Sequence, residues 1–71
     1  MNRKIITIST PYIRLDALLK LAGAVDTGGR AKYVIQNGEV QVNDEVCTMR
    51  GKKLHPGDTA SYGGSIFEVA E

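Results

Sequence analysis

The chain has 71 residues and a formal net charge of +1, with 42% hydrophobic and 24% charged residues, so one small globular domain over residues 1–71 is expected. Such a domain has little room for both a packed core and a deep substrate pocket, which argues against an enzyme. No apolar run approaches the roughly 18 residues of a membrane span and no secretory signal is recognisable, so a cytoplasmic protein is expected. A single cysteine cannot form an internal disulfide, and one cysteine with one histidine cannot build a metal site. We therefore expect no metal and no other cofactor.

The N-terminal third predicts one strand and one helix. Residues 4–8 are rich in β-branched side chains and predict the first strand. Thr10 suits an N-cap and Pro11 suits the first helical position, so a helix is predicted over about residues 11–22, with Gly23 at its end. Its apolar side chains fall on one stripe, formed by Leu15, Leu18, Leu19 and Ala22.

A second helix is predicted from about Gly29 to Asn37. Thr27 or Asp26 can cap its start, and Gly38 stands where a glycine commonly ends a helix. Its apolar face is formed by Ala31, Val34 and Ile35. The opposite face carries two cations, one aromatic ring and two amides, and no acid: Arg30, Lys32, Tyr33, Gln36 and Asn37. This composition favours contact with a polyanion.

The second half of the chain predicts strands. Turn signals separate four short β-like segments, at residues 40–42, 45–47, 59–62 and 65–69. Asn43-Asp44 and Gly63-Gly64 each favour a tight hairpin, and Pro56-Gly57 favours a turn after a basic loop over residues 49–54. The expected fold class is α+β, a small single domain in which two packed N-terminal helices are followed by a small, mainly antiparallel β-sheet.

The charges are unevenly distributed along the chain. Residues 1–38 contain six cations and two acids, a local balance of +4. Residues 39–58 contain three cations and four acids, and the remaining segment contains two acids and no cation. A one-sided distribution of this kind can steer a polyanion even when the net charge is low.

Arg14-Leu15-Asp16, followed by Leu18, resembles the opening of the RNA-binding domain first defined in ribosomal small-subunit protein four. The resemblance covers about residues 12–60 and continues in order through Gly23, Thr27, Ala31-Lys32, Val34-Ile35, Gly38, Val40, Val42-Asn43, Val46, Leu54 and Gly57-Asp58. The segments most similar to the stand-alone bacterial YaaA/YbcJ-like proteins are residues 27–32, 42–45 and 50–54. The resemblance implies an αL RNA-binding motif within residues 12–60 and a non-catalytic role in translation or at the ribosome, docking structured RNA such as rRNA or tRNA.

Eleven residues are candidates for RNA contact: Arg14, Lys20, Thr27, Gly28, Gly29, Arg30, Lys32, Tyr33, Arg50, Lys52 and Lys53. Arginine can bind phosphate through two parallel hydrogen bonds, lysine acts as a point charge, and an exposed tyrosine can stack on a base. The start of the second helix offers free amide N–H groups, and glycines there allow close approach of a phosphate. Many members of the family carry Arg where this chain has Gly28, so one cation of the expected RNA surface is absent.

Structural roles stay open for the same residues. Arg14 can pair with a nearby acid, Lys20 can pair with Asp16, and the two glycines can simply form a turn. The cationic helix face and the basic loop can be solvated surface, Tyr33 can cover the helix edge, and Tyr12, Tyr62 and His55 are expected to pack or to be exposed without a role.

The alternative function is that of a protein-interaction module, or a ribosome-assembly subunit that recognises mainly a ribosomal or assembly protein. Low net charge, Gly28 and the acidic C-terminal segment favour this alternative. No set of nucleophile and general base is recognisable, and the paired glycines do not match a P-loop, which requires a Gly-Lys-Ser/Thr ending.

Overall fold

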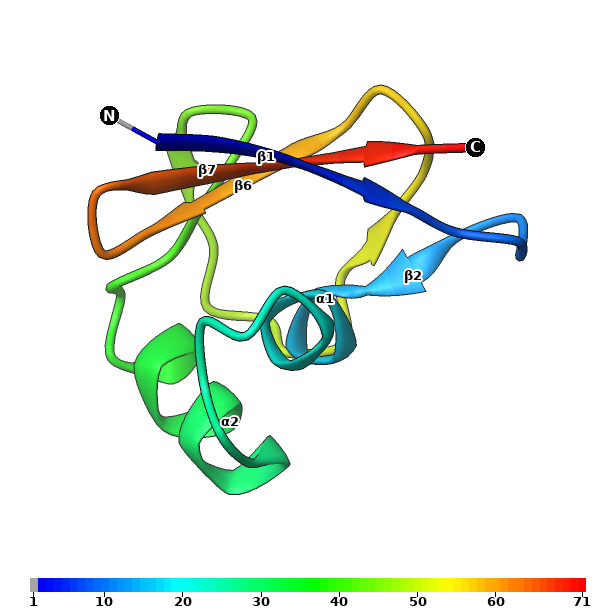
Figure 1. The fold of residues 1–71 in the computed structure, drawn as a ribbon. Coiled ribbons are helices and arrows are strands. Elements are labelled where there is room, and N and C mark those ends of the chain that lie inside the picture. Colours follow the sequence, from blue (N-terminus) through cyan, green and yellow to red (C-terminus); the bar gives the residue numbers. More distant parts are fainter. Residues whose placement is uncertain (1) are drawn as a thin grey trace.

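The computed structural model describes residues 2–71, in which two helices pack against one face of a mixed β-sheet (Figure 1). Along the described part of the chain the elements are β1 Asn2–Thr7, β2 Ile13–Arg14, α1 Leu15–Leu21, α2 Gly28–Gln36, β3 Gln41–Val42, β4 Glu45–Val46, β5 Lys53–Leu54, β6 Thr59–Tyr62 and β7 Ser65–Ala70. The α+β class with both helices in the first half is therefore confirmed.

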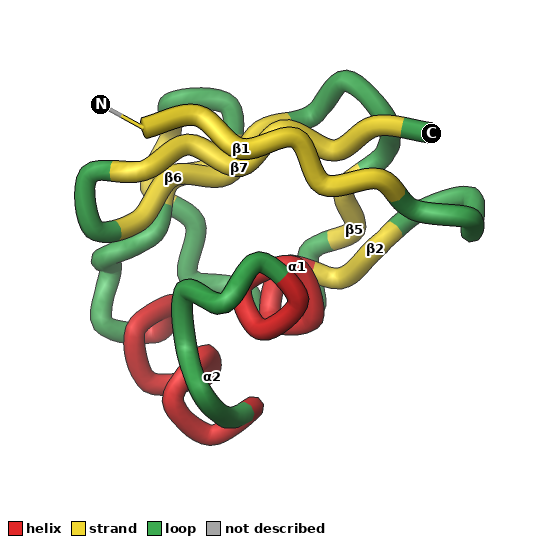
Figure 2. The backbone as a smooth tube through the Cα atoms, viewed as in Figure 1, coloured by secondary structure: helices red, strands yellow, loops and turns green. Residues whose placement is uncertain are grey.

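Five of the strands form one sheet in the order β1-β7-β6-β3-β4 (Figure 2). Three of the four strand pairs in this sheet are antiparallel, whereas β1 runs parallel to β7, with Ile6 opposite Val69. The two remaining strands, β2 and β5, pair antiparallel with each other in a separate two-stranded ribbon. The sheet is mainly antiparallel, as predicted.

The core lies between the helices and the sheet. Its buried side chains come from both helices, from the strands and from the connections between them: Leu15, Leu18, Leu19, Ala22, Val25, Ala31, Val34, Ile35, Val40, Val42, Leu54, Ala60, Phe67 and Val69. Both predicted helical stripes are thus confirmed as core faces. Complete burial of a large apolar side chain contributes about 1.5–3 kcal/mol, so this cluster is the main source of stability. Within residues 2–71, no helix is long and apolar enough to cross a membrane.

The predicted start of the first helix was wrong. The sequence favoured a helix over about residues 11–22 with Thr10 as N-cap, but α1 begins at Leu15. The Thr10 hydroxyl instead donates a hydrogen bond to the carbonyl of Tyr12 at 2.8 Å. The two residues before the helix are extended because they pair with β5. This long-range pairing outweighs the local capping signal of Thr10 and Pro11.

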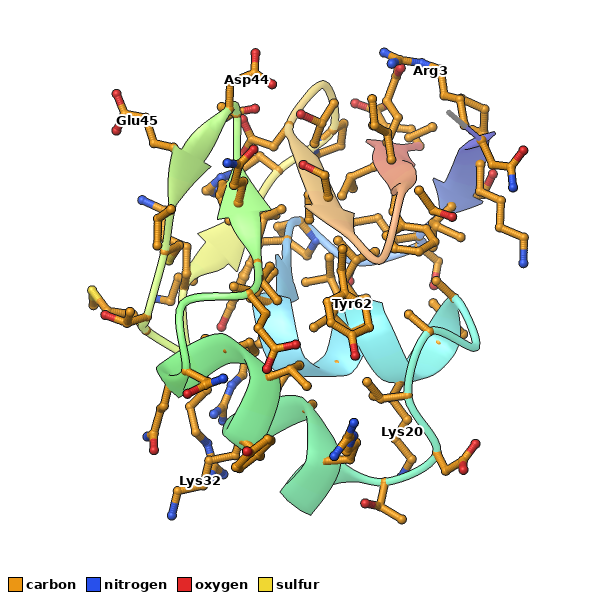
Figure 3. The ribbon with its side chains drawn as sticks, turned by 90° about the vertical axis from the view of Figure 1, so that its left-hand side faces the viewer. Arg3, Lys20, Lys32, Asp44, Glu45 and Tyr62 are labelled. Carbon is orange, nitrogen blue, oxygen red and sulfur yellow. The ribbon has the colours of Figure 1, made fainter. Side chains whose placement is uncertain are left out.

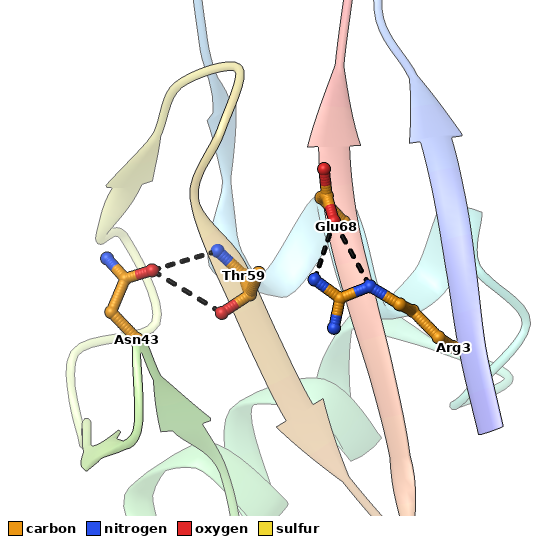
Figure 4. A network of polar contacts seen from close by, with 4 residues as sticks. All are labelled: Arg3, Asn43, Thr59 and Glu68. Carbon is orange, nitrogen blue, oxygen red and sulfur yellow. Dashed lines mark hydrogen bonds and ion pairs between the residues drawn. The ribbon is translucent and has the colours of Figure 1, made fainter. Parts of the chain in front are cut away.

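The β3–β4 hairpin has the predicted turn. Asn43 and Asp44 have φ angles of 49° and 71°, the left-handed region that Asn and Asp tolerate best after glycine. The side-chain oxygen of Asn43 accepts hydrogen bonds from the N–H of Thr59 at 3.0 Å and from its hydroxyl at 3.4 Å (Figure 4). These bonds connect the hairpin turn to β6.

Three further polar contacts, one across β1 and β7 and two at Asp58, hold segments of the chain together. Across β1 and β7, a guanidinium nitrogen of Arg3 lies 2.7 Å from the carboxylate of Glu68 (Figure 4). At the Pro56-Gly57 turn, the carboxylate of Asp58 accepts the backbone N–H of His55 at 2.7 Å. It also accepts the side-chain N–H of Asn43 at 3.2 Å.

The backbone N–H of His55 lowers the pKa of Asp58, burial opposes that shift, and the Asn43 amide adds to it. A lowered pKa means that the charged form stabilises the fold at neutral pH and that this contribution is lost as pH falls through the folded-state pKa, below the ordinary value of about 3.9. We therefore expect Asp58→Ala to lower the free energy of unfolding at pH 7 by about 1–2 kcal/mol. Urea unfolding should show this difference shrinking as the pH falls below about 4.

Asp26→Ala is the control, because Asp26 is a loop acid that is exposed, whereas Asp58 is half-buried, and surface changes of this kind usually stay within about 0.5 kcal/mol. If Asp58→Ala were as stable as this control at pH 7, the two hydrogen bonds of Asp58 would have no part in holding the turn.

Candidate nucleic-acid interface

All eleven candidate residues are exposed at the surface. They come from three places in the fold: the start of α1 and its outer face, the start and outer face of α2, and the basic loop together with Lys53. The predicted basic loop over residues 49–54 is a loop only as far as Lys52, because Lys53 and Leu54 form β5. The geometry of these three segments decides whether the cations form one surface or several.

The basic loop docks directly on the start of α1. The N–H of Leu15 donates to the carbonyl of Lys52 at 2.8 Å, and the N–H of Asp16 donates to the carbonyl of Arg50 at 3.1 Å. The first N–H groups of a helix have no partner within it, and here the loop carbonyls serve two of them. This explains why α1 needs no side-chain cap, and it fixes the loop beside Arg14.

Asp16 lies between two arginines. Its Oδ2 atom is 3.3 Å from Nη2 of Arg14 and 3.5 Å from Nε of Arg50. The Asp16 side chain is 15% exposed, whereas those of Arg14 and Arg50 are 52% and 45% exposed, so the acid is covered and the guanidinium groups face solvent. Gly51 lies against the Arg14 side chain. A Cβ atom added to Gly51 would lie 3.6 Å from Nη2 of Arg14.

The pairing of Arg14 with an acid, one of the alternatives left open by the sequence, is therefore present. Lys20 forms no ion pair within residues 2–71, so the suggested pair with Asp16 is replaced by the two arginines. The carboxylate acts as an organiser of both arginines, a role that the sequence analysis did not assign to it.

A shallow hollow of about 260 Å³ joins α1 to the start of α2. Its lining residues are Arg14, Asp16, Ala17, Lys20 and Gly28. Three of the predicted residues, Arg14 and Lys20 from α1 and its cap and Gly28 from the start of α2, thus border one depression in the surface. Asp16, which lines this hollow, also contacts Arg50 of the basic loop.

Helix α2 begins as predicted. Thr27 is its N-cap with extended backbone angles, and its side-chain oxygen accepts the N–H of Arg30 at 3.1 Å. On the outer face, the guanidinium carbon of Arg30 lies 5.4 Å from the ring centre of Tyr33, a cation–π contact. Lys32 is also exposed on this helix.

The acidic turn of the β3–β4 hairpin lies far from the helices, whereas Glu45 borders one hollow together with Lys52 of the basic loop. Figure 3 shows Lys20 and Lys32 at the helical end of the molecule, and Asp44 and Glu45 at the opposite end. The uneven charge distribution of the sequence is thus also uneven in space, with the exposed acids of the β3–β4 hairpin kept away from the helices.

The structure adds two aromatic residues that the sequence analysis set aside. The ammonium of Lys53 lies 4.9 Å from the ring centre of Tyr12, and the rings of Tyr12 and His55 are 6.1 Å apart. Buried and exposed side chains alternate along β2 and β5, which places Tyr12 and Lys53 on the same outward face. This could be recognised only once the pairing of these two strands was known. Among residues 2–71, no group of three His, Cys, Asp or Glu side chains is arranged to hold a metal ion.

The hydrogen bond from the Arg30 N–H to the Thr27 hydroxyl should stabilise the start of α2. Thr27→Ala removes the acceptor and should lower the free energy of unfolding by about 1 kcal/mol in urea titrations. Thr27→Ser keeps a hydroxyl at the cap and should stay close to the parent. Equal losses in both variants would indicate that the threonine methyl group, and not the cap, matters.

Comparison with known proteins gives a consistent result. The sequence profile described as the S4 domain matches residues 6–70. The chain is 44% identical over 65 residues to "Probable ribosome maturation protein RlbA" of Bacillus subtilis (strain 168), an alignment that covers 90% of this chain and 92% of that relative. It is 37% identical over 59 residues to "Putative RNA-binding protein YbcJ" of Escherichia coli (strain K12), covering 83% of this chain and 84% of that relative.

Proposed function

The chain belongs to the S4 domain family, and from this membership we propose that it is a non-catalytic module that docks structured RNA through the basic face of α2 and the basic loop. The family resemblance predicted from Arg14-Leu15-Asp16 onward is confirmed. The observation that carries the proposal is the position of Arg14. It borders the hollow shared with Lys20 and Gly28 and is joined through Asp16 to Arg50, so cations distant in sequence form one surface.

The proposed contacts follow from the chemistry of folded RNA. An RNA helix presents phosphates and 2′-hydroxyls, and its deep major groove is closed to side chains, so it is recognised mainly by shape and backbone. Arg14 and Arg30 would bind phosphates through paired hydrogen bonds, while Lys20 and Lys32 would act as point charges. Lys52 and Lys53 would extend this surface as a second arm.

The start of α2 would bind one phosphate. Its helix dipole and free N–H groups favour an anion, and no atom lies within 4 Å of the position that a Cβ on Gly28 would take. Gly29 is also exposed, so a phosphate could approach the backbone closely. Together with the cationic α2 face and Tyr33, this segment would form the αL RNA-binding motif.

Ribosomal RNA is the RNA class that we favour. The name of the Bacillus subtilis relative describes ribosome maturation, and that of the Escherichia coli relative describes RNA binding. A cytoplasmic protein that visits rRNA during assembly fits both descriptions. Because few cations face one side, the expected affinity is modest and depends strongly on salt.

A protein contact is a second candidate function, favoured by one observation. Val46 and Met49 are 59% and 66% exposed, and with Cys47 they border a hollow of about 320 Å³ beside the β3–β4 hairpin. Exposed apolar side chains that adjoin one another favour a protein partner. A ribosomal or assembly protein bound there would leave the helical surface free for RNA.

Reversing charge on α2 tests the proposal. We expect Arg30→Glu/Lys32→Glu to lose the RNA that the parent protein crosslinks in cells, as identified by sequencing of the bound fragments. With that RNA in vitro, the slope of log K against log salt should become shallower by about 1 for each phosphate that the variant no longer binds.

The control for charge is Arg3→Glu/Lys4→Glu, which makes the same change in net charge on β1 and should retain the crosslinks. Because it also removes the Arg3–Glu68 ion pair, urea unfolding of this variant is measured to show that it is folded. If both double variants lost the crosslinks equally, the change in net charge, and not the position of the cations on α2, would explain the loss. If no RNA were enriched above background by the parent protein or by either double variant, the protein-interaction function would move to first place.

Gly28 allows a test by gain of function. Because the position is exposed and open and has no positive φ, Gly28→Arg should fit without strain and restore a cation that many family members have. We expect tighter binding to the same RNA by a few fold and a salt slope steeper by about 1. Gly28→Gln, of similar length without charge, should leave the slope unchanged. An unchanged slope for the arginine variant would place this end of α2 outside the interface.

A further inference from the structure

The ribbon of β2 and β5 presents a distinct outward face. Side chains alternate between the two faces of a strand, and in this ribbon Ile13 pairs with Leu54 while Arg14 pairs with Lys53. Leu54 is fully buried and Ile13 packs against the core, so Arg14 and Lys53 occupy the outward face. Tyr12, two residues before Arg14, continues it.

The contacts on this face bring an aromatic ring together with cations. The Lys53 ammonium lies 4.9 Å from the ring centre of Tyr12, and the ring of His55 lies 6.1 Å from it at an angle of 52°. Tyr12 is 37% exposed. Beside it lies a hollow of about 460 Å³ bordered mainly by apolar surface, with Thr10, Pro11, Tyr12, Ile13 and Arg14 as its lining.

We propose that this outward face is a binding site for one unpaired nucleotide of the bound RNA, whose base stacks on Tyr12 while its phosphate contacts Lys53 or Arg14. The inference rests on the proposed RNA-binding function and adds a second kind of contact to it. An aromatic face beside cations is the combination that binds single-stranded nucleotides, because every base has a flat π surface and every nucleotide a phosphate. This site is distinct from Tyr33, the exposed aromatic residue of α2.

Arg14 makes the two sites continuous. It borders both the hollow between the helices and the hollow beside Tyr12. An RNA backbone that crosses Arg14 would therefore have one segment against the helices and the next against the ribbon. The expected ligand is a base-paired segment with an adjoining unpaired nucleotide, such as a bulge or a junction.

The acids near this face do not oppose the proposal. Asp16 contacts both Arg14 and Arg50. Asp58, 3.8 Å from Nδ1 of His55, accepts hydrogen bonds from the His55 backbone and from Asn43. Each carboxylate is thus engaged by protein donors, and the two cations of the ribbon, Arg14 and Lys53, remain exposed.

The base-binding step can be tested without knowing the natural RNA. Adenosine 5′-monophosphate is titrated into the isotope-labelled full chain and followed by NMR, with ribose 5-phosphate as the ligand that lacks the base. We expect the nucleotide to shift the Tyr12 ring signals and the backbone amides of residues 12–14, and ribose 5-phosphate to leave the ring signals in place. Tyr12→Phe should keep the response and Tyr12→Leu should lose it, with amide spectra showing that both are folded.

The second part uses an RNA stem with a single-nucleotide bulge and the same stem fully paired. Stacking of one base predicts that the parent binds the bulged stem about tenfold more tightly. Tyr12→Leu should abolish this preference, whereas Arg30→Glu/Lys32→Glu should weaken both stems and keep it.

Failure of this inference can be separated from failure of the RNA-binding function. Equal binding of both stems by the parent, with no response of the Tyr12 ring to the nucleotide, would overturn the stacking site even if the α2 variant still lost RNA. A ring response to ribose 5-phosphate as large as that to the nucleotide would also overturn it, because the phosphate alone would then explain the binding.

Discussion

The basic loop docks on the start of α1, and this contact positions both the two-stranded ribbon and the cations around Arg14. Two loop carbonyls accept the N–H groups of Leu15 and Asp16, the kind of group that costs about 1–3 kcal/mol when buried without a partner. The same docking aligns β2 with β5 and places Leu54 in the core. The contact between the basic loop and α1 therefore positions both the buried Leu54 and the exposed cations beside it.

Asp16 shows how this contact serves the surface. An acid among cations removes one positive charge from the proposed phosphate-binding surface, so its presence needs a reason. One reason is structural, because the Oδ1 atom of Asp16 accepts the N–H of Ala17 at 2.8 Å in the first turn of α1, where an acid also interacts favourably with the helix dipole. Its geometry gives a second reason, because its other carboxylate oxygen contacts two arginines from different segments and limits where their guanidinium groups can lie.

The sequence predicted what is decided locally and missed what is decided by distant pairing. Both apolar helical stripes, the Thr27 cap and the Asn43-Asp44 turn follow from spacing and side-chain chemistry, and all were confirmed. The start of α1 was wrong because Thr10 and Pro11 resemble a cap, whereas β5 holds the following residues extended. The parallel pairing of β1 with β7, which joins the two ends of the described chain, has no local signal.

The difference between local and long-range signals also explains which candidate site residues could be predicted from the sequence. The cations of α2 were found because a helix face can be read from one short segment. The outward face of the ribbon was missed because Tyr12 acquires its neighbours only through the register of two strands far apart in sequence. That register also places the ribbon next to the helices, since Arg14 borders both hollows. Under the proposed function, two adjoining faces would select RNA by the relative position of a paired and an unpaired segment, and such selection would not require a large net charge. The charge of +1 is compatible with this proposal, because residues 1–38 carry six cations and only two acids.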